Sequence, residues 1–86
     1  MNGFEIASSV RDFILERFPA SRRRLRNDTD PLLESGIIDS LGVLDVVAFV
    51  ESTFNITVDD EDLSPDNFQS VAQMAAYVER KRNVSG

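Results

Sequence analysis

The segment Leu32–Leu41 places Ser40 at the start of an apolar helix, in an 86-residue chain without histidine or cysteine. A nucleophilic serine needs a neighbouring base, usually a histidine, to take up its proton. The only lysine, Lys81, lies between Arg80 and Arg82, where a solvated ammonium is a poor general base. We therefore expect no catalytic residue in the chain. Two roles remain for Ser40: it caps the helix, or another enzyme modifies it.

Other groups with possible binding chemistry give weaker indications. The run Asp59–Asp62 lacks the alternating spacing and the closing glutamate of a calcium-binding loop, so we expect a solvated acidic helix start and no metal site. The aromatic residues Phe49, Phe54, Phe68 and Tyr77 are expected to pack in the core rather than around a ligand.

Charge is divided sharply along the chain, whose net charge is -6. Residues 27–79 contain twelve Asp and Glu residues and no Lys or Arg, whereas cationic residues outnumber acidic ones on both sides of this segment. Such an acidic body repels nucleic acid and anionic lipid and attracts basic patches on proteins. We therefore expect protein partners and no nucleic acid.

Length and composition predict a single domain over residues 1–86. A hydrophobic content of 42% is typical of a globular chain. The sequence has no apolar run of about eighteen residues, no secretory signal pattern and no cysteine for disulfides. We expect a cytoplasmic monomer without stable membrane insertion. We also expect it to be free-standing, because the first helix begins almost directly after Met1.

Hydrophobic periodicity predicts an all-α fold, a small four-helix bundle with three main helices and one short helix. The first helix is expected to begin at a cap formed by Asn2 and Glu5 and to stop at Pro19, and the second is expected from Asp39 or Ser40 to about Phe54. A short third helix near Asp59–Leu63 follows a strand-like stretch at 56–58 and precedes a turn at 64–67. The fourth helix begins at a capping box formed by residues 70 and 73.

A long loop of about twenty residues separates the first two helices, from Pro19 to Ile38. A loop of this length fits a compact domain only if it packs its own apolar side chains. Those available are Leu25, Leu32, Leu33, Ile37 and Ile38. Gly36 is expected to provide a turn with positive φ just ahead of the serine.

On a helical wheel the second helix has two faces. Its wider arc is expected in the core and contains Val43, Leu44, Val46, Val47, Val50 and Phe54. The opposite arc contains Leu41, Asp45, Ala48 and Ser52, with Glu51 at its margin. An exposed leucine and a small alanine beside carboxylates, next to Ser40, predict a face that binds partners. Taken alone, an exposed leucine carries no such meaning.

Three segments fall in a distinctive order around this helix: Gly36–Leu41, which reads Gly-Ile-Ile-Asp-Ser-Leu, then Ile56–Leu63, then Asn67–Val71. Together they resemble the acyl carrier protein family. The resemblance covers about residues 30–82 and, more loosely, the first helix. Asp-Ser-Leu alone recurs by chance, and its setting between the other segments makes the match specific.

The resemblance implies that Ser40 carries 4'-phosphopantetheine, transferred from coenzyme A by a phosphopantetheinyl transferase. The arm ends in a thiol that holds an acyl or aminoacyl group as a thioester, so loading and transferring enzymes are further implied partners. Asp39 matches the aspartate that in this family helps to bind the transferase or its metal. The implied fold is a four-helix bundle with one short helix. A chain without cysteine or base agrees with a thiol and catalysis supplied from outside.

Three features depart from housekeeping fatty-acid carriers: Gly42 stands where many have a polar or acidic residue, Ala48 and Ser52 make the partner face less acidic, and Arg22–Arg26 adds a basic cluster in the loop. We therefore expect a dedicated biosynthetic pathway, with fatty acyl, hydroxyacyl, polyketide and amino acid cargo all open. The arginine cluster is expected to be solvated rather than a second docking patch. The alternative is an unmodified, carrier-like acidic adaptor domain, against which Ser40 in its full motif argues.

Overall fold

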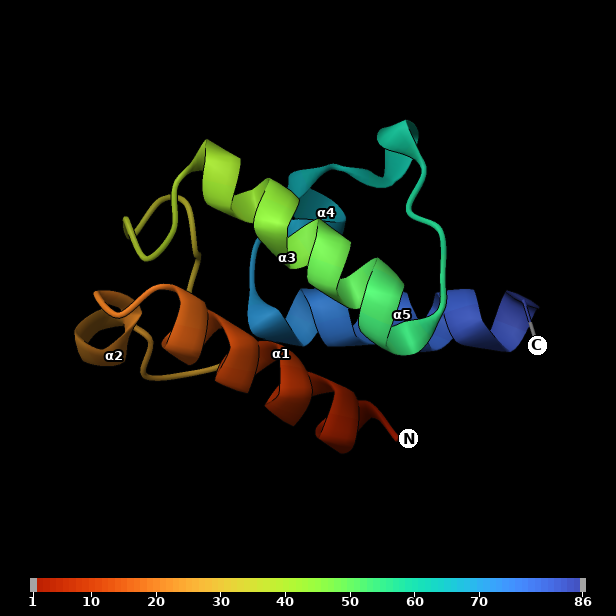
Figure 1. Ribbon diagram of the computed structural model, residues 1–86, viewed down its shortest axis with the longest axis horizontal. Helices are drawn as coiled ribbons and strands as arrows, with labels where there is room; N and C mark the ends of the chain where they lie inside the picture. Colours follow the sequence, from red (N-terminus) through yellow and green to blue (C-terminus); the bar gives the residue numbers. More distant parts are fainter. Residues whose placement is uncertain (1, 86) are drawn as a thin grey trace.

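Three fifteen-residue helices form most of the fold. The structure is a computed structural model, and it describes the backbone of residues 2–85 and the side chains of residues 2–82. The three helices are α1 (Gly3–Arg17), α3 (Ser40–Phe54) and α5 (Val71–Ser85). Between them lie the short helices α2 (Ser21–Arg24) and α4 (Pro65–Phe68) and the 3-10 turn η1 (Asp60–Asp62). Within the described residues there is no strand (Figure 1). The predicted all-α bundle is confirmed.

Local capping residues set where the long helices begin, as the sequence predicts. The side chain of Asn2 accepts a hydrogen bond from the Glu5 N–H at 2.9 Å. At the start of α5, the Ser70 hydroxyl accepts the Gln73 N–H at 3.2 Å. A side-chain acceptor at these positions satisfies one of the unpaired N–H groups of the first helical turn. Helix α3 ends at Phe54, and the next residue, Asn55, caps it with a left-handed backbone (φ 55°).

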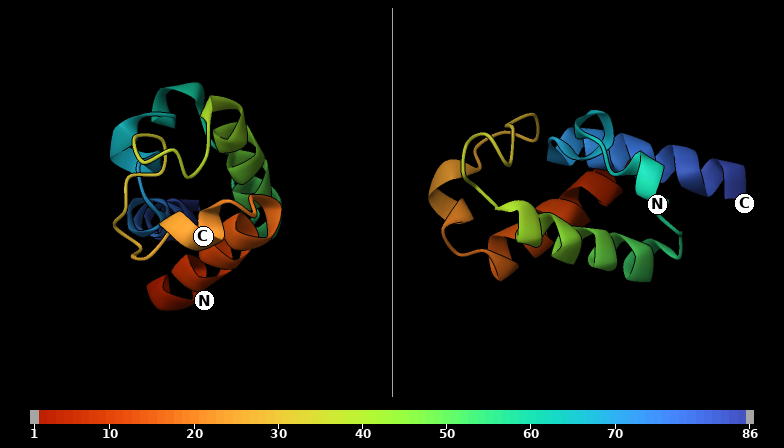
Figure 2. Two further views of the ribbon diagram at one scale, coloured as in Figure 1. Left: turned by 90° about the vertical axis from the view of Figure 1, so that its left-hand side faces the viewer. Right: turned by 90° about the horizontal axis from the view of Figure 1, so that it is seen from above.

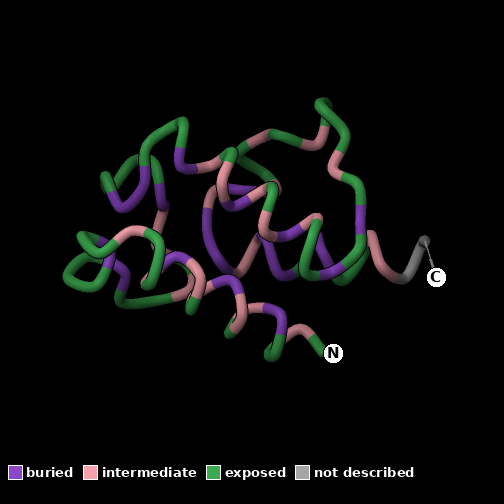
Figure 3. Tube along the Cα trace, in the orientation of Figure 1, coloured by how far each residue is buried: buried purple, intermediate pink, exposed green. Residues whose placement is uncertain are grey.

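The core lies where α1 packs against α5 and α3 crosses them (Figures 1 and 2). Figure 3 shows buried residues on the inward turns of all three helices. Each helix contributes branched aliphatic side chains that are fully buried, namely Ile6, Val10, Ile14, Val46, Val50, Val71 and Val78. Of the aromatic residues expected in the core, Phe54, Phe68 and Tyr77 are buried, and the half-buried Phe49 stacks on Phe13 with ring centroids 4.3 Å apart.

The long connection from Pro19 to Ile38 is more ordered than the predicted loop, because it contains α2 and a series of turns. Four of its five expected apolar side chains are buried, and Leu33 is the exception, at 47% exposed. Two backbone hydrogen bonds of 2.8 Å, from the N–H of Leu32 to the carbonyl of Gln69 and from Ala72 to Asp28, tie it to the start of α5. The connection is therefore a fixed wall of the bundle.

The segment between α3 and α5 also differs from its prediction in detail. The expected turn at 64–67 is the helical turn α4, which begins with Pro65 at its first position, where the missing N–H costs nothing. The expected short helix near Asp59–Leu63 is reduced to the three residues of η1. Residues 56–58 form no strand, and the N–H of Val58 instead donates to the Glu51 carboxylate at 2.9 Å.

Candidate functional site

Ser40 is the first residue of α3 and is exposed, and its hydroxyl does not cap the helix. The cap is Asp39, whose Oδ1 accepts the N–H of Gly42 at 2.7 Å. Asp39 therefore fills the capping role, which was the alternative to modification for Ser40. Gly36 has a positive φ of 70°, as predicted, and the turn it forms leads the chain through two buried isoleucines into the cap.

Close packing explains why a glycine stands at position 42, which the sequence did not reveal. An ideal Cβ placed on this residue would lie 3.0 Å and 3.1 Å from two ring carbons of Phe18 and 3.3 Å from the capping oxygen of Asp39. Most real Cβ atoms keep a wider separation from such neighbours. The glycine lets the end of α1 approach the first turn of α3, so it belongs to the packing around Ser40.

One face of α3 presents apolar side chains to solvent beside Ser40. Leu41 is 74% exposed, and Ala48 and Ser52, which the sequence assigned to the same face, are exposed as well. Leu44 was expected in the core, but it is 55% exposed and therefore joins this face. The wheel placed it wrongly because no other element covers that side of the helix. We call Leu41, Leu44, Asp45 and Ala48 the α3 face.

The two carboxylates predicted at or near this face have partners within the chain. Asp45 Oδ2 lies 3.0 Å from Nη2 of Arg17, at the end of α1. Glu51 uses Oε2 to accept the Val58 N–H, which fixes the chain as it leaves α3. Sequence reasoning missed both contacts because they join α3 to residues outside the helix, which helical periodicity does not place.

An apolar cleft of about 200 Å³ lies between α3, the long connection and α4. It is lined by Leu33, Glu34, Val43, Leu63, Ser64, Pro65, Phe68 and Gln69. Val43 follows Ser40 by about one helical turn, so the two residues lie on neighbouring parts of the helix surface. The cleft therefore lies close to the end of α3 that carries the serine. Leu33 and Leu63, both partly exposed, stand at this cleft.

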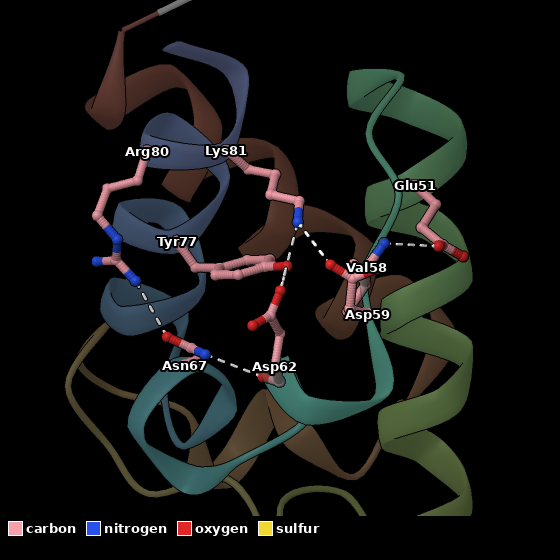
Figure 4. Close-up of polar contacts among 8 residues, drawn as sticks. All are labelled: Glu51, Val58, Asp59, Asp62, Asn67, Tyr77, Arg80 and Lys81. Carbon is pink, nitrogen blue, oxygen red and sulfur yellow. Dashed lines mark hydrogen bonds and ion pairs between the residues drawn. The ribbon is translucent and has the colours of Figure 1, made fainter. Parts of the chain in front are cut away.

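A network of side chains joins η1 and α4 to α5 (Figure 4). The Tyr77 hydroxyl donates to Asp62 at 2.7 Å, and Nζ of Lys81 lies 3.1 Å from Asp59 and 3.4 Å from Asp62. The Asn67 amide donates to the backbone carbonyl of Asp62 at 3.0 Å. Because these residues flank Leu63, Ser64 and Pro65, the network fixes the segment that lines the cleft.

The same contacts change the proton affinity of three groups. The hydrogen bond from Tyr77 lowers the pKa of Asp62. Burial, followed by the hydrogen bond to Asp62, raises the pKa of Tyr77 to about 12. The hydrogen bond to Asp59 raises the pKa of Lys81.

The arginine cluster in the long connection makes contacts with the backbone, although its side chains are exposed. Nε of Arg22 donates to the Leu15 carbonyl at 3.2 Å, and Nη1 of Arg24 donates to the Gly36 carbonyl at 3.0 Å. Arg24 therefore holds the turn that precedes Asp39. Two members of the predicted solvated cluster thus have structural contacts.

Among the residues with described side chains, no three histidine, cysteine, aspartate or glutamate side chains are placed to hold a metal ion. None of the helices in the described part of the chain is long and apolar enough to span a membrane.

Residues 8–78 match the model of the family described as "Phosphopantetheine attachment site". The D-alanyl carrier proteins of Streptococcus pyogenes serotype M1 and of serotype M49 (strain NZ131) are each 34% identical to this chain over 50 residues. That match covers 58% of this chain and 63% of each relative, so the chain spans less than two thirds of their length. Since the family match extends over most of the sequence, the chain belongs to the family of proteins with a phosphopantetheine attachment site.

Proposed function

We propose that Ser40 is the residue that carries 4'-phosphopantetheine, and that the chain holds an acyl or aminoacyl group on this arm and presents it to partner enzymes. The observation that carries the proposal is the position of Ser40: an exposed hydroxyl at the first residue of a fifteen-residue helix, inside the matched segment, with the capping role taken by Asp39.

The residues around Ser40 suit the group it would hold. In the transfer, the serine oxygen bonds to the phosphorus of the pantetheine phosphate in coenzyme A, adenosine 3',5'-bisphosphate leaves, and the serine proton passes to the transferase. The bound arm supplies a thiol for a thioester with the cargo. Because Ser40 is the first residue of α3, a phosphodiester formed on it would meet the positive end of the helix dipole, which favours an anion. Asp39 holds the first turn in place and is proposed to face the transferase.

Partners and cargo follow from the surfaces beside the serine. The α3 face, with Glu51 and Ser52 at its edge, is proposed to bind the transferase and the loading and transferring enzymes. The relatives are named for D-alanine, which supports an aminoacyl cargo, whereas the apolar cleft beside Val43 supports an apolar acyl cargo. We propose that the chain acts in the cytoplasm, as a monomer, without catalysis of its own.

The attachment residue is tested by incubating the apo protein with coenzyme A, magnesium and a broad-specificity phosphopantetheinyl transferase. The intact mass of the wild type should rise by one phosphopantetheine group, and fragmentation should place the group on Ser40. Ser40→Ala should keep its circular dichroism spectrum and gain nothing. Ser35→Ala, a matched change in the preceding exposed turn, should be modified like the wild type.

Modification that persists in Ser40→Ala would move the attachment to another residue. No modification of the wild type by several transferases would favour the unmodified adaptor.

A further inference from the structure

Arg17, at the end of α1, reaches the exposed face of α3 and pairs with Asp45. We propose that Arg17 is a specificity-determining residue of the α3 face. In the free protein it forms an ion pair with Asp45, and when a partner enzyme binds, a cation of the partner replaces Arg17 in that ion pair. The inference rests on the proposed function, because it takes the α3 face as the surface that partner enzymes bind.

One further contact holds the Arg17 side chain near this carboxylate. Its guanidinium carbon lies 5.5 Å from the centre of the Phe18 ring, within cation-π range. That ring lies against Gly42 and packs edge-on to Phe13, with centroids 6.5 Å apart. Phe18 therefore packs between the end of α1 and the first turn of α3, and its ring faces the guanidinium of Arg17. The pair therefore joins the end of α1 to the exposed side of α3.

The pair also remains open to a partner. The side chain of Arg17 is 57% exposed and that of Asp45 is 44% exposed. Exposed ion pairs are weak, because water screens them and two long side chains lose freedom. A cation on a partner can therefore replace Arg17 at Asp45 with a small loss. The contact tunes recognition and does not block it.

Charge and apolar surface together define the partner. Asp45 belongs to the acidic segment 27–79, which has no cation of its own, and Leu41 and Leu44 lie one helical turn or less from it. The matching surface is a basic protein surface with an apolar hollow for the two leucines. Such a partner reaches the full charge of Asp45 only when Arg17 turns aside. A partner with a cation placed next to Asp45 displaces Arg17 and binds more tightly than a partner without one.

The test is a double-mutant cycle on the initial rate of modification of Ser40 by one transferase, at limiting apo protein and at two salt concentrations. We expect Arg17→Gln to raise kcat/KM by about 1.5- to 5-fold, the range that measured strengths of exposed ion pairs correspond to. In the Asp45→Asn background the same change should have a smaller effect, because the contested carboxylate is absent. High salt should shrink the difference between the two backgrounds.

Arg23→Gln is the matched control, since it removes the same charge from an exposed residue whose side chain makes no hydrogen bond or ion pair with the described residues. It should change the rate less than Arg17→Gln, and equally in both backgrounds. Equal effects of Arg17→Gln in the two backgrounds, or an effect no larger than that of Arg23→Gln, would overturn the inference and leave only a net-charge effect. A wild type that is not modified at all would overturn the proposed function itself.

Discussion

Asp39 and Ser40 could each cap α3, but only Ser40 carries a hydroxyl that could be modified. A serine or an aspartate at the start of a helix serves as a cap, and the sequence alone left both open. The backbone places Asp39 before the helix, so its carboxylate turns back to Gly42, and Ser40 becomes the first helical residue with an exposed hydroxyl. A change at Asp39 would therefore loosen the first turn as well as alter any contact with a transferase.

Gly42 provides a prediction at the scale of one residue. Alanine normally stabilises a helix interior by about 0.5–1 kcal/mol relative to glycine. Here the added methyl group would meet the Phe18 ring at 3.0 Å, and overpacking costs about 1–3 kcal/mol. We expect Gly42→Ala to lower the free energy of unfolding by about 1 kcal/mol, measured by urea denaturation.

Ser52→Ala, at an exposed position of the same helix, is the control for propensity and should raise stability slightly. If Gly42→Ala were as stabilising as Ser52→Ala, the Phe18 ring would have moved aside, and the close approach of α1 would not depend on the glycine.

At the scale of elements, the sequence predicts what is fixed by neighbours along the chain. The three long helices begin where local caps at Asn2, Asp39 and Ser70 satisfy the first N–H groups. Helix α2 could not be predicted in this way, because it depends on contacts with α1, such as the hydrogen bond of 3.2 Å from the buried Ser21 hydroxyl to the Ile14 carbonyl. The exposure of Leu44 likewise depends on which elements cover α3.

In the candidate site too, some features follow from neighbouring residues along the chain and others depend on packing between elements. Ser40, Asp39 and the exposure of Leu41 and Ala48 follow from motif and helical period. The pairing of Asp45 with Arg17 joins residues 28 positions apart in the sequence, and no periodic pattern contains it. Charge pairs between elements are decided by packing, which a single sequence does not specify.

The network between η1, α4 and α5 predicts a pH dependence at this scale. In the folded state, burial and the hydrogen bond to Asp62 raise the pKa of Tyr77 to about 12, whereas an unfolded tyrosine ionises near 10. Between these values unfolding releases a proton, so stability should fall as the pH rises from 10 to 12, by roughly 2–3 kcal/mol in total. Because the chain has one tyrosine, phenolate absorbance of the folded protein reports this group directly.

Tyr77→Phe is the matched variant. It should be less stable at neutral pH by about 1–3 kcal/mol, through loss of the hydrogen bond to the Asp62 carboxylate, and its alkaline decline should be shallower. A phenolate midpoint near 10 in the folded wild type would show that the hydroxyl is open to solvent and does not fasten η1 to α5.

For the whole molecule, the fold brings the cationic ends of the chain to its acidic middle. Cations from the two ends pair with four of the twelve carboxylates of residues 27–79: Asp28, Asp45, Asp59 and Asp62. The arrangement reduces repulsion in the folded state, but among described residues the other eight carboxylates have no ion pair. The molecule therefore keeps an excess of negative charge that a basic partner can meet.

The same excess predicts how stability responds to salt. Unpaired carboxylates repel one another more in the folded state than in the expanded chain, and added ions screen this repulsion. We expect the midpoint of thermal unfolding at neutral pH to rise when sodium chloride is added to a dilute buffer. Magnesium chloride at equal ionic strength should raise it at least as much, because a divalent cation can also bind weakly to the folded surface. A midpoint that responds to neither salt would contradict the prediction and would mean that repulsion within the acidic segment contributes little to the stability of the folded state.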